Sequence, residues 1–468
     1  MNKETKYHLG FLWRICLIAA LGGLLFGYDF VVIGGAKPFY EAYFGINAKP
    51  WLQGWTMSSA LVGCLGGVII SGMLADLFGR KKLLILAAIL FTASAIGTAL
   101  AGSLASFCFY RIIGGGGIGL ASGLSPMFIA EVSPKEYRGR LVSFNQLTIV
   151  IGILAAQVIN YLIAQHVPTE FSVAEIAESW NGQIGWRWMF GAGTFPAVVF
   201  LILMFFIPES PRWLMKNGNV DSARRILARI GGDDYANAEV ADIQKTISED
   251  ERGTVRYADL LEPKILPIIA LGVFLAVFQQ WCGINVIFNY AEEVFTSAGY
   301  HINGMLLSIV LTGVINLVFT FVAIGTVDRL GRRPLMLIGA GGLGLIYAVL
   351  GYGYYIHLTG VLMLLMVLCA TACYSMTLGP IVWVILAEIY PNRIRGAAMS
   401  VAVAALWIAC TVLTCTFPIM NQTLGAYGTF WTYGGICFFA LGVIYFRLPE
   451  TRGKSLEEIE AKFNERKS

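Results

Sequence analysis

Two residues of opposite charge, Asp29 and Arg111, stand inside long apolar stretches of the sequence. An ionisable side chain in such a stretch is energetically costly and points by default to a functional site. A carboxylate beside a guanidinium stays charged, whereas burial without that cation favours the protonated form. A carboxyl group balanced between these effects can take up a proton when the cation moves away. The pair therefore predicts either reversible proton binding or a static buried ion pair.

The composition indicates a membrane protein, since 57% of the residues are hydrophobic and only 13% are charged. A soluble domain carries about 25% charged residues. The nine Cys are scattered singly and the four His form no cluster, so we expect no metal and no cofactor. The sequence contains no recognisable nucleophile–base pair or phosphate loop. We therefore expect neither an enzyme nor a nucleic-acid-binding protein.

Apolar runs long enough to cross a bilayer, roughly twenty residues each, recur twelve times. They cover 11–34, 52–75, 83–102, 104–130, 141–164, 188–207, 265–291, 304–327, 335–356, 361–387, 397–420 and 427–446. The sequence thus predicts an all-α polytopic membrane protein with twelve transmembrane helices. We expect an N-terminal six-helix bundle at 1–207, a cytoplasmic helical linker at 208–264, a C-terminal six-helix bundle at 265–446 and a cytoplasmic tail at 447–468.

The distribution of basic residues predicts the orientation of the chain. Loops after even-numbered spans carry Arg80, Lys81, Lys82, Lys135, Arg138, Arg140, Arg329, Arg332, Arg333, Arg393 and Arg395. Loops after odd-numbered spans carry only Lys37, Lys49 and Arg187. By the positive-inside rule both termini are then cytoplasmic. We expect a monomer in the lipid bilayer of the cell (inner) membrane.

Short charged motifs repeat in the two halves of the chain. Asp76-x-x-Gly79-Arg80 returns 252 residues later as Asp328-x-x-Gly331-Arg332. Likewise, Ala130-Glu131-x-x-Pro134 returns as Ala387-Glu388-x-x-Pro391, and Pro208-Glu209 returns as Pro449-Glu450. Two similar halves that begin on the same side of the membrane form a parallel repeat about an axis along the membrane normal. The predicted bundles are therefore pseudo-symmetric.

The repeated motifs place acids and bases together at the cytoplasmic ends of the spans, where arginine can pair with carboxylates. One interpretation is a latch that holds the two halves together on this side. The other is that the charges only set orientation and anchor the helices at the headgroups. The predicted latch residues are Asp76, Arg80, Glu131, Arg138, Glu209, Arg212, Asp328, Arg332, Glu388 and Arg395.

Asp29 and Arg111 are expected at the same depth in the membrane. Asp29 is five residues from the outer end of the first span, and Arg111 is about seven from the outer end of the fourth. At about 1.5 Å rise per residue, both lie some 7–10 Å below the boundary. Equal depth and opposite charge make each the expected partner of the other.

Several longer motifs carry a family resemblance: basic loops at 80–82 and 329–333, PESPRWL at 208–214, QQxxGIN at 279–285, GPxxW at 379–383 and PETRG at 449–453. With these motifs the chain resembles the sugar porter family of the major facilitator superfamily. It is similar to the bacterial proton–xylose symporters and the facilitative glucose transporters of that family. The resemblance implies the MFS fold, a central sugar site and alternating access.

A sugar site needs side-chain amides, which both donate and accept hydrogen bonds, and an aromatic face against the ring. The resemblance implies that Gln146, Gln279, Gln280, Asn285, Asn316 and Trp383 bind the sugar and that Phe26 and Trp407 line the cavity. A single amide in a span more often links two helices. Leu406, Asn289 and Ile153 depart from residues common in the family, which bears on substrate identity.

The resemblance also gives a role to the charged pair. Proton-driven sugar porters have an aspartate at the position of Asp29 and an arginine at that of Arg111, whereas facilitative animal members tend to lack the acid. The predicted function is proton-coupled symport of a monosaccharide, a pentose or hexose such as xylose or glucose, with Asp29 coupling the proton. The alternatives are a facilitative sugar uniporter and a sugar sensor that does not transport.

Overall fold

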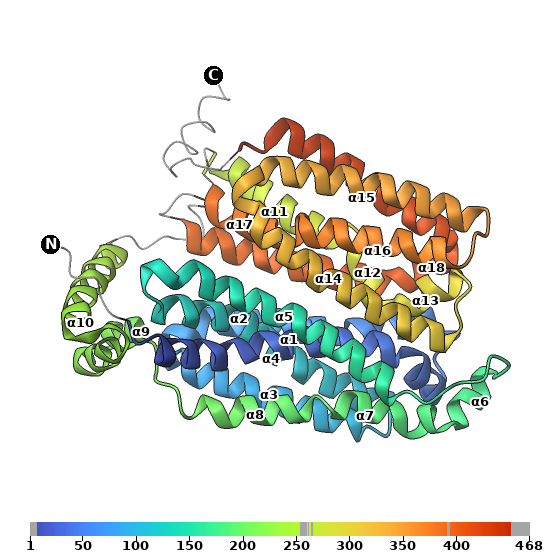
Figure 1. The fold of residues 1–468 in the computed structure, drawn as a ribbon, viewed down its shortest axis with the longest axis horizontal. Coiled ribbons are helices and arrows are strands. Elements are labelled where there is room, and N and C mark those ends of the chain that lie inside the picture. The colour runs from blue at the N-terminus through green and yellow to red at the C-terminus, as the bar shows by residue number, and fades with distance from the viewer. Residues whose placement is uncertain (1–6, 253–259, 261, 264, 391–393, 451–468) are drawn as a thin grey trace.

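The computed structural model describes residues 7–252, 260, 262–263, 265–390 and 394–450 of the 468-residue chain. The regular structure in these residues is entirely helical. Figure 1 shows two layers of helices that run roughly alongside one another, the first half of the chain in blue to green and the second in yellow to red. This arrangement agrees with the all-α fold that the sequence predicts.

The first half is built from nine consecutive helices. They are α1 (Leu9–Phe44), α2 (Pro50–Phe78), α3 (Arg80–Ala99), α4 (Leu104–Val132), α5 (Lys135–Ile163), α6 (Val173–Glu178), the π-helix η1 (Asn181–Gly185), α7 (Trp186–Gly191) and α8 (Thr194–Met204). The last three follow one another without a long loop and form one apolar run, Asn181–Met204. That run corresponds to the sixth predicted span.

The second half is more interrupted than the first. It contains α11 (Leu266–Trp281), α12 (Ile284–Asn289), α13 (Ala291–Ser297), α14 (Ile302–Leu330), α15 (Arg332–Tyr355), α16 (Val361–Met376), α17 (Leu378–Ile389) and α18 (Arg395–Arg447). Between the halves lie α9 (Pro211–Lys216) and α10 (Val220–Arg252), the latter bent at Gly232. The predicted linker thus contains helices, while residues 451–468 of the predicted tail lie outside the described residues.

Helical runs that are long and apolar enough to cross a membrane number eleven among the described residues. The last of them, Ala397–Arg447, has 51 residues. At 1.5 Å per residue that is about 76 Å, more than twice the ~30 Å of a hydrocarbon core. Gly425 breaks this helix with a φ of 67°, a conformation that glycine adopts readily. The chain turns back there (Figure 1), so α18 supplies two of the twelve crossings.

The first helix is longer than the sequence predicts. The first span was expected to end at residue 34 and Lys37 to lie in a loop, but α1 continues through Pro38 to Phe44. Pro38 does not end the helix, and residues 31–42 are all buried. The prediction was wrong because a lysine and a glutamate mark the end of an apolar run only when they face water. Here both are buried by packing.

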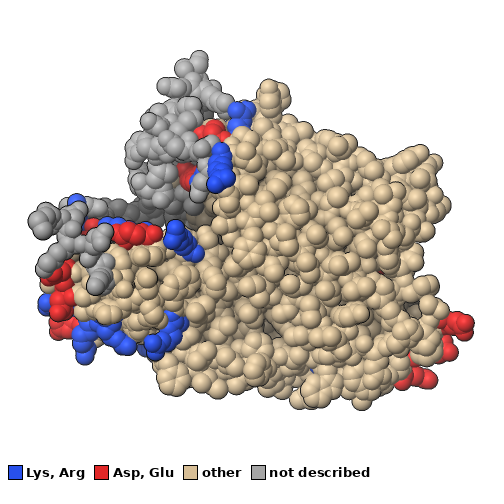
Figure 2. All heavy atoms as spheres, in the orientation of Figure 1, with Lys and Arg blue, Asp and Glu red and all other residues tan. Residues whose placement is uncertain are grey.

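Charge divides the molecule into two polar ends and an apolar middle. Figure 2 shows Lys, Arg, Asp and Glu gathered near α9 and α10 at one end, acidic groups at the other, and an almost uncharged surface between them. We call these the α10 end and the α6 end. The uncharged surface exposes large apolar side chains such as Phe109 and Phe195. A surface of this kind suits lipid, and the chain is a multi-pass membrane protein.

Two spans of the second half are discontinuous, for local reasons. The break between α11 and α12 falls at Gly283, whose φ of 88° is accessible to glycine. The break between α16 and α17 falls at Thr377, just ahead of Pro380. The ring of a proline clashes with the carbonyl four residues earlier, here that of Met376, and this disfavours a continuous helix. The first break lies within the QQxxGIN motif at 279–285, and the second lies two residues ahead of the GPxxW motif at 379–383.

Glycines bring α2 and α4 into backbone contact. A Cβ atom added to Gly115 would lie 1.8 Å from the carbonyl oxygen of Ala60, and one added to Gly63 would lie 2.0 Å from that of Ile112. Any side chain at these positions must therefore push the two helices apart. Close approach through small residues is a common way to pack helices in a membrane.

We expect Gly115→Ala to destabilise the first bundle by about 1–3 kcal/mol, because overpacking forces backbone shifts. Gly66→Ala is the matched control on α2, since nothing lies within 4 Å of a Cβ added there. Thermal unfolding of both variants in detergent measures the difference. A Gly115→Ala melting temperature equal to that of Gly66→Ala would contradict the close packing of α2 and α4.

Candidate functional site

The predicted partners Asp29 and Arg111 are in contact between α1 and α4. Arg111 Nη1 lies 2.7 Å from Asp29 Oδ1, and Nη2 donates to the backbone carbonyl of Asp29 at 3.0 Å. The side chain of Arg111 is 2% exposed and that of Asp29 is 15% exposed. The guanidinium also lies 5.5 Å from the centroid of the Phe190 ring. The pair is thus a buried ion pair held by one helix on each side.

The second carboxylate oxygen of Asp29, Oδ2, is buried and has no hydrogen-bond partner among the described residues. It faces the turn of α4 that holds Gly114, where an added Cβ would lie 3.1 Å from it. Burial favours the neutral acid, whereas Arg111 favours the carboxylate. Oδ1 therefore accepts the hydrogen bond from Arg111, and Oδ2 is the atom that could be protonated.

The predicted sugar-binding amides of the second half are buried around the break between α11 and α12. Gln279 donates to the carbonyls of Leu378 and Gly379, at 3.3 and 2.9 Å. Asn285 donates to the side-chain carbonyl of Gln280 at 2.5 Å. Gln279 therefore ties α11 to the start of α17, whereas Gln280 and Asn285 form a pair across Gly283.

Two predicted aromatic residues meet from opposite halves. The rings of Phe26 on α1 and Trp407 on α18 have centroids 5.9 Å apart. Asn285 reaches the same turn of α18, because its amide lies 3.7 Å from the sulfur of Cys410. The indole nitrogen of Trp407 is buried without a hydrogen-bond partner in the described part of the chain. These aromatic and amide groups offer what a sugar requires.

The other predicted sugar residues lie on neighbouring helices. Asn316 on α14 accepts a hydrogen bond from Ser375 of α16 at 2.6 Å. Gln146 on α5 is half-buried, and Trp383 on α17 is 37% exposed. The structure thus groups Phe26, Trp407 and the Gln280–Asn285 pair closely, and it gives Gln279 and Asn316 helix–helix contacts.

Four predicted latch residues of the first half, Asp76, Arg80, Glu131 and Glu209, form one cluster at the α10 end. Arg80 contacts Glu131 at 2.9 Å and Asp76 at 3.1 Å, and Ser210 donates to Glu131. Glu209 accepts hydrogen bonds from the backbone N–H groups of Arg80, Lys81 and Ser210, at 2.8–3.1 Å. Arg138 donates to the carbonyl of Ala130 at 3.1 Å, and Arg212 lies in α9.

The second half repeats this arrangement. Arg332 contacts Glu388 at 3.0 Å, as Arg80 contacts Glu131. Glu450 accepts from the backbone N–H groups of Arg332 and Arg333 at 3.0 Å, as Glu209 does in the first half. The predicted latch residues Asp328 and Arg395 lie outside the described side chains. The contacts described for both clusters join residues of the same half.

A second buried ion cluster lies at the α6 end, and the sequence analysis missed it. Lys37 of α1 contacts Glu41 one turn later, at 3.1 Å, and Glu292 and Glu293 of α13, at 3.0 and 2.8 Å. We call these four residues the Lys37 cluster. The i, i+4 spacing of Lys37 and Glu41 is the signal that could have extended the first span. The cluster connects the two halves at the α6 end.

Comparison with known proteins identifies the family. The family model described as "Sugar (and other) transporter" matches residues 15–463. This chain belongs to that sugar transporter family. Membership confirms the resemblance drawn from the motifs and the expectation that the chain is not an enzyme.

Individual sugar transporters match along almost their whole length. The D-xylose-proton symporter of Escherichia coli K12 is 40% identical over 488 residues, which cover 98% of this chain and 97% of the symporter. The arabinose-proton symporter of Bacillus subtilis is 36% identical, with 97% and 96% covered. A solved structure of the E. coli xylose transporter XylE, in a partially occluded inward-open conformation, superposes with a TM-score of 0.83 at 38% identity and covers 95% of this chain and all of the solved chain.

We expect Glu209→Ala to free the backbone of the loop between α2 and α3. Charge-assisted hydrogen bonds contribute about 1.5–3 kcal/mol each, so hydrogen exchange at the amides of Arg80 and Lys81 should accelerate at least about tenfold. The exposed Glu136, which accepts a hydrogen bond from Tyr7, supplies the control Glu136→Ala. Equal exchange rates at these amides in the two variants would show that Glu209 does not hold the loop.

Proposed function

We propose that this sugar transporter is a proton-coupled symporter that imports a monosaccharide, a pentose or hexose, by alternating access. The names of the relatives in E. coli and B. subtilis support xylose- or arabinose-like substrates and a proton as the coupled ion. The observation that carries the proposal is the buried Asp29–Arg111 pair, in which Oδ2 of Asp29 is free to accept a proton. A uniporter has no need of such a group.

The proposed coupling uses the competition between burial and charge at Asp29. While Arg111 is 2.7 Å away, the carboxylate is stabilised; if Arg111 moves, the buried carboxyl takes up a proton instead. Asp29 lies one helical turn from Phe26, which contacts Trp407 of the other half. Sugar that enters between these aromatics displaces α1 relative to α18, and that displacement reaches the carboxyl. Proton and sugar are coupled through this one helix.

The proposed sugar site is formed by Gln280, Asn285, Phe26 and Trp407, with Gln146, Gln279, Asn316 and Trp383 on the surrounding helices. Asn285 donates to the side-chain carbonyl of Gln280 at 2.5 Å. A sugar hydroxyl can replace that hydrogen bond with two of its own, one to each amide. The proposed site can therefore take up a hydroxyl without leaving these two groups unpaired.

For the membrane arrangement we propose a monomer in the cell (inner) membrane with both termini cytoplasmic. The α10 end is then cytoplasmic and the α6 end faces outward. The likeness to an inward-open form of XylE supports a conformation closed at the outer end, as does the Lys37 cluster, which connects the halves there. In the opposite conformation we propose that the charged clusters at the α10 end, which include Glu131 and Glu388, latch the halves together, with Arg395 as a further predicted member whose side chain lies outside the described part of the structure.

We expect Asp29→Asn to abolish sugar accumulation driven by a pH gradient, because asparagine cannot exchange a proton. Sugar counterflow without a gradient should persist, since it needs only alternating access. Proteoliposomes loaded with a panel of pentoses and hexoses measure both, and Asp242→Asn, an exposed acid that pairs with Lys135, is the control. Gradient-driven accumulation by Asp29→Asn would refute the coupling role and leave the uniporter.

We expect Asn285→Ala to weaken sugar binding about tenfold, since one lost hydrogen bond in a buried site is worth about 0.5–1.5 kcal/mol and leaves Gln280 unpaired. The control Asn217→Ala removes an exposed amide on the linker, which donates to the backbone carbonyl of Trp213. Tryptophan fluorescence with added xylose or glucose gives the dissociation constants. Unchanged affinity in Asn285→Ala would remove this residue from the sugar site.

A further inference from the structure

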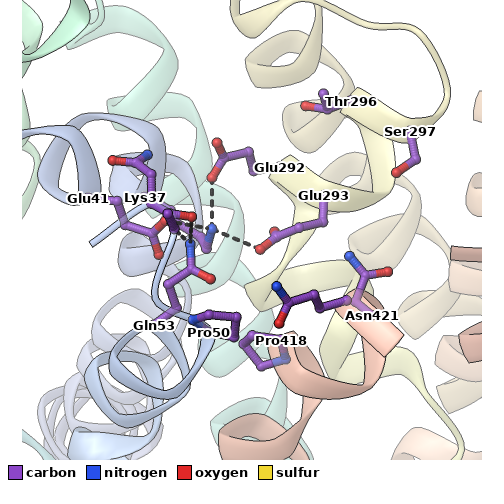
Figure 3. Close-up of a pocket in the computed structure, with 13 residues that line it drawn as sticks. Lys37, Glu41, Pro50, Gln53, Glu292, Glu293, Thr296, Ser297, Pro418 and Asn421 are labelled. Atoms are coloured by element: carbon purple, nitrogen blue, oxygen red, sulfur yellow. Dashed lines mark hydrogen bonds and ion pairs between the residues drawn. The ribbon is translucent and has the colours of Figure 1, made fainter. Parts of the chain in front are cut away.

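The Lys37 cluster holds more negative than positive charge. The three N–H bonds of the Lys37 ammonium are matched by three carboxylates, Glu41, Glu292 and Glu293, at 2.8–3.1 Å (Figure 3). Lys37 is 2% exposed and Glu41 is 1% exposed. Glu292 and Glu293 are 23% and 20% exposed, so if all three acids were ionised, two negative charges would remain without a counter-ion in a mostly buried place. Such an excess is strongly unfavourable away from water.

The elements that pack around the cluster supply no second cation among the described residues. The titratable groups that face it are Tyr40 on α1 and Tyr290 between α12 and α13, both neutral when protonated. Helices α2 and α18 contribute only uncharged polar groups, Gln53, Asn421 and Gln422. Gln53 donates to Glu41 at 2.7 Å, which satisfies one oxygen but adds no charge. The negative excess must therefore be met by something taken up from outside.

Two carboxylate oxygens mark where a proton would be held. Oε1 of Glu41 and Oε2 of Glu293 are buried and have no hydrogen-bond partner in the described part of the chain. Each belongs to a carboxylate whose other oxygen contacts Lys37. A proton on either oxygen removes one negative charge and leaves the contact to Lys37 intact. The four residues also line a pocket of about 420 Å³ at the α6 end, which gives water and protons access.

The cluster depends on closure of the α6 end. Lys37 and Glu41 come from the first half, whereas Glu292 and Glu293 come from the second, more than 250 residues away. When α13 separates from α1, the carboxylates regain water and no longer share one cation. Protonation of each acid is then less favourable than it is in the closed cluster. Closure and proton uptake are therefore linked.

We propose that the Lys37 cluster is a second proton-binding site, which takes up a proton from the outer side as that side closes. The inference rests on the proposed function, because alternating access and the outward position of the α6 end belong to it. It assigns the proton to Glu41 or Glu293 and is independent of the proton on Asp29. An acidic exterior then favours the closed outer side, which precedes release of sugar to the interior.

The direction of the pH effect follows from burial. Burial raises the pKa of the Glu293 carboxyl in the closed form. An acid with a higher pKa in the closed form than in the open form stabilises the closed form at low pH. That stabilisation is lost as the pH rises through the pKa that the acid has in the closed form. The outer side therefore opens as the pH rises.

A distance measurement between two spin labels at the α6 end tests the proposal. The labels are placed at Gly102→Cys and Thr359→Cys, two exposed loop positions in opposite halves, after the nine native cysteines are replaced. All variants carry Asp29→Asn, so that Asp29 does not titrate. Between pH 5 and pH 8 we expect the ratio of open to closed molecules to rise about tenfold or more, as one linked proton gives within a single pH unit.

Glu41→Gln and Glu293→Gln imitate the protonated acids and should each stay closed at pH 8 and reduce the pH response. The control Glu175→Gln neutralises an exposed acid of α6 that accepts hydrogen bonds from Ser172, and this variant should respond like its parent. A response absent from the Asp29→Asn parent, or unchanged in both cluster variants, would overturn the proposal. The Asp29→Asn accumulation assay tests the proposed symport separately, so the two can fail independently.

Discussion

The burial of charge in an apolar bundle is the constraint on which this structure depends. Asp29 and Arg111 can stay in the membrane only because each neutralises the other at 2.7 Å. The glycines of α4 allow close approach around the pair, since a Cβ added to Gly114 would lie 3.1 Å from Asp29 Oδ2. A charge that is stable only with its partner is also sensitive to any movement of that partner. The same interaction therefore stabilises the bundle and, under the proposed function, makes the charge of Asp29 respond to movement of Arg111.

The two halves use this constraint in different ways at the two ends. At the α10 end the ion pairs between described residues stay within one half, since Arg80 meets Glu131 and Arg332 meets Glu388. At the α6 end, Lys37 takes its partners from both halves. Charges satisfied within a half allow the halves to separate at little electrostatic cost, whereas charges shared between them oppose separation. The conformation described here is consistent with that difference.

Much of this arrangement could be predicted from the sequence. Span length, the repeated motifs and the equal depth of Asp29 and Arg111 led to the fold and to their pairing, because an isolated pair in hydrocarbon has few alternatives. The Lys37 cluster could not be found by the same reasoning. Lys37 and Glu41 follow the apolar run, and only the packing of α13 shows that they are buried. Which amides face one another across Gly283 likewise depends on a helix break whose geometry the sequence does not contain.

The contrast between a continuous first half and an interrupted second half has a mechanical consequence. In the first half, backbone contacts such as that between Ala60 and Gly115 pack α2 and α4 too closely for either helix to shift against the other. In the second half, the interruptions at Gly283 and Thr377 remove helical hydrogen bonds and create local joints. Any bending during a transport cycle will concentrate at those joints. Helices α2 and α4 then move as one stiff unit, and the second half is the part that bends around the substrate.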